Sequence, residues 1–394
     1  MTATIEVPRA GAECVDITAA AARIGAEVAA EAADSVDRDA RFPHETFAAL
    51  RAARLLSATI PADLGGKGAG VTEAGAAVEA LGRHCASSGM VLAMHYLQIA
   101  CLARHGQNQL LRAFLRRVEA DQLLLASATT EIGIGGKLRQ SSCAVELADG
   151  RFELEKHAPV ISYGAHADAL LVTARRTPDS APNDQVLVLC EPPGLELEQT
   201  GSWDTIGMRG TVSPGFVVRA SGDAGQVLTD SFGDIAARTM LPVSHLLWSH
   251  VWLGIAGAAL EKAGGFVRAE ARKQPGTTPA SATRLAEAGA MYATMRAMVR
   301  EATRAFCELD SGSLADDPGI GLALSMNALK VSASERVVEI VTKALRICGM
   351  AGYKEGSPYS MGRLLRDAHS AALMVGNDRL LGDNAQLLLL YKGW

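Results

Sequence analysis

The sequence predicts a mainly helical α+β protein, with a helical segment first, a β-rich segment in the middle and a helical bundle at the end. Three observations support this fold class. The first segment is rich in alanine and repeatedly helical, the middle one changes to short apolar or alternating runs, and the last one has apolar residues spaced three and four apart. At 394 residues the chain exceeds one simple core, so we expect two or three packed domains.

The first predicted domain covers residues 1–125 and is helical from about Val15 onward. Its helices are interrupted at Phe42-Pro43 and again between Ile60 and Gly66, because proline and paired glycines end helices. The second predicted domain covers residues 126–236. Its short apolar runs predict strands at 169–173, 185–189 and 216–218, separated by Gly, Pro, Asp and Ser.

The third predicted domain, residues 237–394, contains two long amphipathic helices. Apolar side chains recur on one helix face at Leu285, Ala288, Tyr292, Met295, Val299, Ala302 and Phe306. A second stripe, within a helix from about Met326 to Cys348, consists of Leu329, Ala333, Val337 and Ile340. Two such helices side by side predict a four-helix bundle, and their surplus apolar surface predicts a homodimer or homotetramer.

Composition argues against several classes of function. The net charge is −5 and there is no basic stripe, so we expect no nucleic-acid partner. The longest apolar run, Val251 to Leu260, is too short to cross a bilayer, and the chain begins without a basic region followed by an apolar stretch. We therefore expect a cytoplasmic protein without a membrane partner. Seven scattered cysteines without a C-x-x-C pair argue against a disulfide framework and a metal site.

The order of domains and several short motifs together resemble the acyl-CoA dehydrogenase superfamily from Phe42 to the last helix. No G-x-G-x-x-G follows a strand, so a nicotinamide site has no support. The motifs similar to that family are Pro61 to Gly66, Thr130-Glu131 to Lys137, Val160-Ile161-Ser162 in place of a Trp-Ile-Thr strand, Gly207-Met208-Arg209-Gly210-Thr211, Arg272-Lys273-Gln274-Pro275-Gly276 and Arg366-Asp367-Ala368.

The resemblance implies a middle domain built as a β-barrel or sandwich, and an FAD cofactor. A flavin ring needs hydrogen bonds at N5 and at the N1/O2 edge, because negative charge collects there when the ring accepts a hydride. The resemblance gives these roles to Thr129, Thr130 and Ser162, with Gly135 and Gly136 in the adjoining turn. Without the family context, Thr130 and Ser162 are also typical of residues that cap strand ends.

The resemblance also implies that a neighbouring subunit completes the FAD site. Its arginine for the pyrophosphate falls on Arg272, and an arginine fork suits phosphate oxygens. Arg346 and Gly349 fall near the adenosine end, although the family's Gln-x-x-Gly-Gly reads Arg-Ile-Cys-Gly-Met here. Asn377 falls among the cofactor-binding residues as well. This arrangement requires at least a dimer.

The glutamate base of the family's ordinary reaction has no counterpart in this chain. In the family it lies in a Tyr-Glu-Gly-Thr loop shortly after Arg-Asp-Ala, and here that loop reads Met374-Val375-Gly376-Asn377. Valine cannot accept a proton. The alternative position on the first helix of the C-terminal domain falls near Leu247, where there is no acid, and the arginine that usually neighbours it is Trp248.

Four other residues are weak candidates for the base: Asp378, His369, His250 and His95. Each also has an ordinary structural interpretation, since Asp378 can cap a helix and a single histidine on a helix is commonly a packed or surface residue. Glu131 is expected to be structural, and Asp367 is expected to pair with a nearby arginine.

Three functions stay open at this point. The first is an FAD oxidoreductase that acts on the CH–CH bond of an acyl thioester, carried by CoA or a carrier protein, with a displaced or absent base. The second is a flavin-dependent monooxygenase of the same fold, which uses reduced flavin and O₂ on a small aromatic or nitrogen-containing substrate. The third is a non-redox or non-catalytic binding protein.

Overall fold

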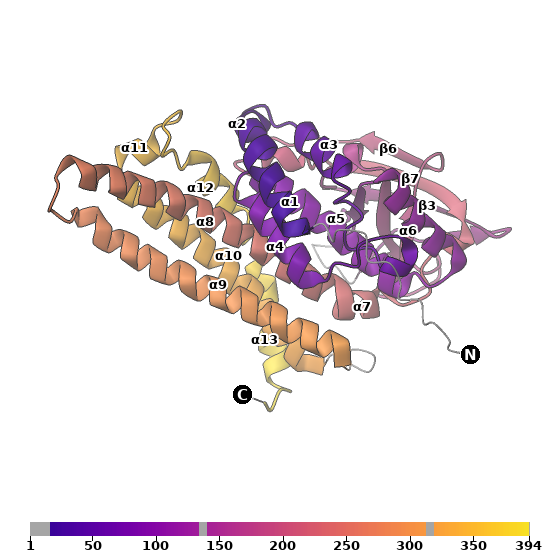
Figure 1. Cartoon of the computed structure of the whole chain (residues 1–394). Coiled ribbons are helices and arrows are strands. Elements are labelled where there is room, and N and C mark those ends of the chain that lie inside the picture. The colour runs from indigo at the N-terminus through magenta and orange to yellow at the C-terminus, as the bar shows by residue number, and fades with distance from the viewer. Residues whose placement is uncertain (1–15, 134–139, 313–318, 394) are drawn as a thin grey trace, which may run out of the picture.

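The computed structural model describes residues 16–133, 140–312 and 319–393. Helices come first, short strands lie in the middle of the chain, and long helices follow them (Figure 1). This arrangement confirms the predicted mainly helical α+β fold.

The first helices are joined by the breaks that the sequence predicts. They are α1 (Ile17–Ile24), which continues through a π-helical stretch (Gly25–Ala29) into α2 (Ala30–Arg38), then α3 (His44–Ala52), α4 (Val71–Gly82), α5 (Ala86–His105) and α6 (Gln109–Asp121). Pro43 precedes α3, and the Ile60–Gly66 segment lies between α3 and α4. A Cβ on Gly66 would lie 2.1 Å from the Ile60 carbonyl oxygen, so this turn requires glycine.

The strands form two small sheets. In the first, the order is β1 (Leu125–Ala128), β4 (Ala169–Arg175) and β5 (Gln185–Cys190), with β1 parallel to β4. In the second, antiparallel sheet the order is β2 (Glu146–Ala148), β3 (Arg151–Ala158), β7 (Phe216–Asp223) and β6 (Leu195–Gln199). The three strands predicted from apolar runs correspond to β4, β5 and β7.

One motif does not have the predicted structure. Val160-Ile161-Ser162 was expected to be a strand by resemblance, but β3 ends at Ala158 and these residues lie in the turn that follows. Backbone hydrogen bonds still fix the turn, because the Ile161 N–H donates to the Pro214 carbonyl at 3.0 Å. The segment is therefore an ordered turn outside the sheet, and the expected strand was wrong.

The C-terminal part is built around one long buried helix. A short α7 (Phe232–Ile235) and a π-helical stretch (Ala236–Met240) lead into α8 (Leu241–Lys273), which packs against α4, α5, α9 (Ala280–Gly312) and α10 (Gly319–Cys348). Figure 1 shows α8, α9 and α10 side by side. The remaining helices are α11 (Met350–Tyr353), α12 (Gly362–His369) and α13 (Asn377–Leu388).

The two predicted stripes lie on the inner faces of α9 and α10. Ala288, Met295, Val299 and Phe306 of α9 are buried, as are Leu329, Ala333, Val337 and Ile340 of α10. The helices, however, extend further than predicted, and the helical run through α7 and α8 crosses the expected limit at residue 236. The division into three separate domains therefore stays a prediction.

Two helices of the described chain are long and apolar enough to cross a membrane by length and composition. They are α5 and the run Phe232–Lys273, in which 83% and 94% of the most apolar window is buried inside the protein. Such burial is typical of core helices in folded proteins. The described cysteines are free, and all except half-buried Cys307 are buried; among the described residues no cluster of metal-ligating side chains occurs.

Candidate functional site

The residues assigned to the flavin ring lie together at the end of β1. The Thr130 hydroxyl donates to the Val160 carbonyl at 2.8 Å, which joins the end of β1 to the turn that carries Ser162. Thr130 is exposed, and Thr129 and Ser162 are half-buried. Gly135 and Gly136 lie outside the described residues. The Thr130 hydroxyl thus uses its hydrogen within the protein, and the flavin roles of Thr130 and Ser162 stay predictions.

A strained loop supports the Ser162 turn. Met208, Val212 and Tyr163 all have positive φ, at 51°, 38° and 43°. Such conformations cost about 1–3 kcal/mol each and persist only where the surroundings impose them. The Tyr163 N–H donates to the Thr211 carbonyl at 2.7 Å, and the Tyr163 hydroxyl donates to the Leu125 carbonyl at 2.8 Å. The turn is thus held from two sides.

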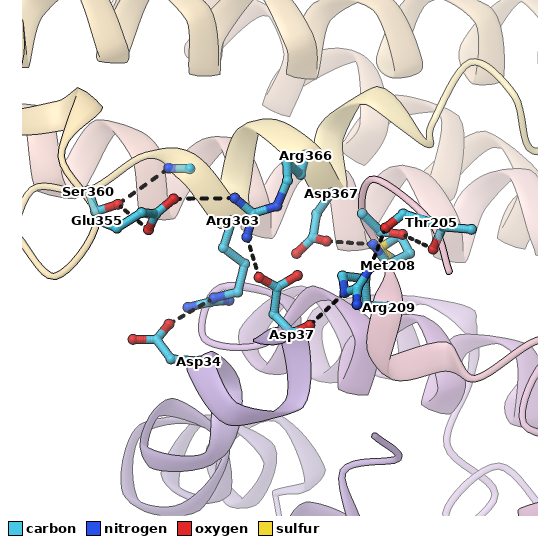
Figure 2. Close-up of polar contacts among 12 residues, drawn as sticks. Asp34, Asp37, Thr205, Met208, Arg209, Glu355, Ser360, Arg363, Arg366 and Asp367 are labelled. Carbon is cyan, nitrogen blue, oxygen red and sulfur yellow. Dashed lines mark hydrogen bonds and ion pairs between the residues drawn. The ribbon is translucent and has the colours of Figure 1, made fainter. Parts of the chain in front are cut away.

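A polar cluster fastens this loop to α12 and α2 (Figure 2). The Met208 N–H donates to the Asp367 carboxylate at 2.7 Å, and the Arg209 guanidinium donates to the Asp37 carbonyl at 2.8 Å. Asp367 was expected to pair with an arginine. Its neighbour Arg366 instead forms ion pairs with Asp37 and Glu355, so the prediction for Asp367 was wrong.

The environment of Asp367 makes it a titrating group. Burial raises the pKa of its carboxyl from 3.8 to about 6, opposed by the Met208 N–H bond and by Arg363. The raised pKa means that the folded state binds the proton more tightly than the unfolded state. The stability that this carboxyl contributes is therefore fully present below about pH 4 and is lost as the pH rises through about 6.

We expect Asp367→Asn to remove this titration while keeping an oxygen acceptor for Met208. The groups that face Asp367 stay the same in both proteins: Arg363 and Arg366 on its own helix, Asp37 on α2 and the Met208 N–H. The free energy of unfolding of the wild type should rise relative to the variant by about 1–2 kcal/mol between about pH 8 and about pH 5. Denaturant titrations of both proteins measure it, and a constant difference would contradict the buried carboxyl.

Glu131 is structural, as expected. Its carboxylate accepts hydrogen bonds from the Ser141 hydroxyl, from Ser142 and from the Cys143 N–H, and it forms a buried ion pair with Lys156 at 3.1 Å. Despite the opposing effect of burial, these hydrogen bonds and the Lys156 charge lower the pKa of Glu131 to about 2. A carboxylate so fully used is a poor base.

The loop with the expected base position is held by a buried lysine that the sequence reasoning missed. Lys330 of α10 donates to the Val375 carbonyl at 3.0 Å and to the Asn377 side-chain oxygen at 2.7 Å. Burial and the charge of Arg379 lower the pKa of Lys330 to about 8. Val375 has φ +47° and packs against the core.

Asn377 was assigned to the cofactor, but its amide is used within the protein. Besides the bond from Lys330, its oxygen accepts from the Ser334 hydroxyl at 3.2 Å, and its nitrogen lies 3.1 Å from the same hydroxyl. The side chain therefore stabilises the 370–377 loop against α10, which corrects the assignment.

His95 is not a base in this structure. Its Nε2 donates to the Leu56 carbonyl at 2.7 Å and its Nδ1 accepts the Leu125 N–H at 3.0 Å. Burial lowers its pKa to about 4. Both ring nitrogens are used by backbone groups, so the ring fixes the start of β1 and has no nitrogen left for a substrate.

The other three base candidates lie in different parts of the protein. His250 is buried, with Nδ1 3.0 Å from Glu79 of α4 and Nε2 3.2 Å from Thr303 of α9, beside a pocket of about 630 Å³ between these helices. His369 and Asp378 are exposed. Asp378 lies in the first turn of α13, where negative charge stabilises a helix. The structure brings none of them into contact with Ser162.

A second pocket lies where the ends of α8 and α10 meet. It has a volume of about 590 Å³, and its lining includes Lys273, Gln274, Ser281 and Gly349. Arg272 and Arg346 are exposed on the same two helix ends. Gly349 has φ +54°, a conformation that favours glycine. Gly349 therefore lines this pocket, whereas Arg272 and Arg346 are the exposed sequence neighbours of the lining residues Lys273 and Ile347.

Comparison with known families matches residues 12–121 to the acyl-CoA dehydrogenase N-terminal domain and residues 233–385 to its C-terminal domain. The chain belongs to the acyl-CoA dehydrogenase family. It is therefore a flavoenzyme of this fold.

Relatives within the family differ in their chemistry. The amino sugar nitrososynthase DnmZ of Streptomyces peucetius is 27% identical, covering 88% of this chain and 85% of its own. The cyclohex-1-ene-1-carbonyl-CoA dehydrogenase of Syntrophus aciditrophicus is 25% identical, covering 88% and 82%. Among solved structures, FMN-bound TdsC from Paenibacillus sp. A11-2 superposes with a TM-score of 0.82 at 20% identity, covering 95% and 98%.

The residues present fit a flavin in two respects. Ser162 and Thr130 offer hydroxyls at one edge, and the pocket at Gly349 lies beside cationic Lys273 and Arg272. Near Lys330, the indole N–H groups of Trp248 and Trp252 and the Nε2 of His245 are buried without a partner among the described residues. These three atoms are enclosed by protein, so they are unsatisfied polar groups of the core.

Proposed function

We propose that this protein is a flavin-dependent monooxygenase that uses reduced flavin, preferentially FAD, and O₂ to oxygenate a small molecule. One oxygen atom of O₂ enters the substrate and the other leaves as water. The reduced flavin supplies the two electrons and, with solvent, the protons. The substrate class that we favour is an amine, because the relative DnmZ is named an amino sugar nitrososynthase.

The observation that most supports this proposal is the polar group that contacts the Val375 loop. A dehydrogenase of this family needs a carboxylate there or at the alternative position near Leu247 to remove a carbon-bound proton. Neither position has one, and the polar group in contact with the Val375 carbonyl is the amine of Lys330. This amine donates to the Val375 carbonyl and to the Asn377 side-chain oxygen, so it acts as a hydrogen-bond donor in this loop. A monooxygenase that attacks an amine lone pair needs no carbon acid to be deprotonated, so it tolerates this arrangement.

Dehydrogenation of an acyl thioester with a displaced base is the second candidate. The relative from Syntrophus aciditrophicus supports it, because it is named a cyclohex-1-ene-1-carbonyl-CoA dehydrogenase. Anaerobic titration of the oxidised holoprotein with straight-chain acyl-CoAs distinguishes the two candidates. We expect the visible flavin absorbance to persist over many minutes. Rapid bleaching by a thioester would contradict the monooxygenase.

We also propose that flavin binding requires a homodimer or homotetramer. Arg272, Arg346 and Gly349 are exposed at the far ends of α8 and α10, whereas Ser162 lies beside the loop that Asp367 holds. In a shared site, one subunit supplies the ring edge and its partner supplies the phosphate pocket. Light scattering should give a dimer or larger for the holoprotein, and a flavin-loaded monomer would contradict this arrangement.

A further inference from the structure

Ser213 and Thr211 form a chain of hydroxyl groups that ends on Ser162. The Thr211 and Ser213 hydroxyl oxygens lie 2.9 Å apart, and the Ser213 hydroxyl donates to the Ser162 oxygen at 3.0 Å. Thr211 and Ser213 are buried, while Ser162 is half-buried. None of the sequence motifs assigned a role to Ser213.

The hydrogen-bond geometry gives this chain a direction. The Thr211 hydroxyl donates to the Met208 carbonyl at 2.9 Å. The Ser213 hydroxyl donates to the Ser162 oxygen at 3.0 Å, and the Thr211 carbonyl at 3.3 Å is its more distant acceptor. Because Ser162 accepts from Ser213, its own hydrogen points away from Ser213.

The loop that carries the chain has little freedom to move. Asp367 accepts the Met208 N–H at 2.7 Å. A Cβ on Gly207 would lie 2.2 Å from the Arg366 carbonyl oxygen, and one on Gly210 would lie 2.2 Å from a Val36 methyl group. Contacts with α12 and α2 thus fix the loop on both sides (Figure 2), and the backbone that carries Thr211 is held in place.

We propose that Ser213 is a positioning residue, which fixes the Ser162 hydroxyl as a hydrogen-bond donor toward the flavin ring. The inference rests on the assignment of Ser162 to the ring edge and deepens the proposed function. A fixed donor suits the oxidised ring, whose N5 accepts a hydrogen bond, and opposes the reduced ring, whose N5–H needs an acceptor. This preference lowers the midpoint potential of the flavin, so the reduced ring becomes a stronger electron donor to O₂.

The test is a double-mutant cycle on the FAD-loaded protein, with Ser213→Ala, Ser162→Ala and the double variant. The readouts are the flavin's midpoint potential and its visible spectrum. Ser213→Ala should free the Ser162 hydroxyl to rotate and accept, which favours reduced flavin by up to roughly tenfold and raises the potential by about 30 mV. In the Ser162→Ala background the same change should have no effect.

Thr205→Val is the matched control, because Thr205 lies in the same loop and donates to the Gly207 carbonyl at 3.0 Å, outside the chain. It should leave the potential and spectrum unchanged. The proposal is overturned if Ser213→Ala shifts neither readout, or shifts them equally with and without Ser162. Wild type that binds no flavin would instead refute the proposed function, and bound flavin that is insensitive to Ser162→Ala would refute the assignment of Ser162.

Discussion

Val375→Glu is expected to create acyl-CoA dehydrogenation, with a rate on the order of 10²-fold above wild type toward straight-chain thioesters. The new carboxylate would occupy the loop position where the family's base lies. Burial raises the pKa of a carboxyl toward the range useful for a base. Lys330, whose Nζ lies 3.0 Å from the Val375 carbonyl, opposes that rise, so we expect the low end of the range for a general base.

The backbone conformation at residue 375 is compatible with this substitution. Val375 already has φ +47°, a conformation that is harder for a β-branched side chain than for glutamate. Val375→Gln is the matched control, because it has the same length and polarity without a basic carboxylate. Equal rates for the two variants would show that residue 375 does not lie at the base position, whereas fast wild-type turnover would show that this loop needs no base.

Arg272→Ala is expected to lower the affinity for FAD by about 10- to 100-fold, because a charged, forked hydrogen bond to phosphate contributes about 1.5–3 kcal/mol. Arg272 is exposed at the end of α8, beside the pocket lined by Gly349. Calorimetry or equilibrium dialysis with FAD measures the effect.

Two controls make the Arg272 result specific. FMN, which lacks the adenosine half, should lose less affinity than FAD. Arg296→Ala removes an exposed arginine of α9 that stacks on Tyr292, and it should leave FAD binding unchanged. An unchanged FAD affinity in Arg272→Ala would remove the pocket between α8 and α10 from the cofactor site.

The regular part of the fold could be predicted because its signals are local. Apolar stripes identified α9 and α10, and continuous apolar runs identified β4 and β5, which are buried along nearly their whole length. β3 was missed although its residues alternate between exposed and buried, because Lys156 occupies one of the buried positions. Its ion pair with Glu131 and its hydrogen bonds to Thr173, both from distant segments, make that burial favourable.

The site was harder to predict because its key contacts join distant segments. Lys330 lies on the buried stripe of α10, four residues after Met326, and a lysine in that position was the available signal. Its partner Asn377 is identified only in the folded chain. Ser213 lies two residues beyond the Gly-Met-Arg-Gly-Thr motif, and its role depends on the Ser162 turn folding back onto it.

Isotopically labelled O₂ tests the central claim most directly. Purified holoprotein with chemically reduced FAD should be mixed with labelled O₂ and a panel of amino sugars and aromatic amines. The masses of the products are then measured by mass spectrometry. The account predicts a product that carries labelled oxygen, formed only with the protein and reduced flavin present. If every compound stays unlabelled while oxidised wild type is rapidly bleached by an acyl thioester without O₂, the protein is a dehydrogenase and the account is wrong.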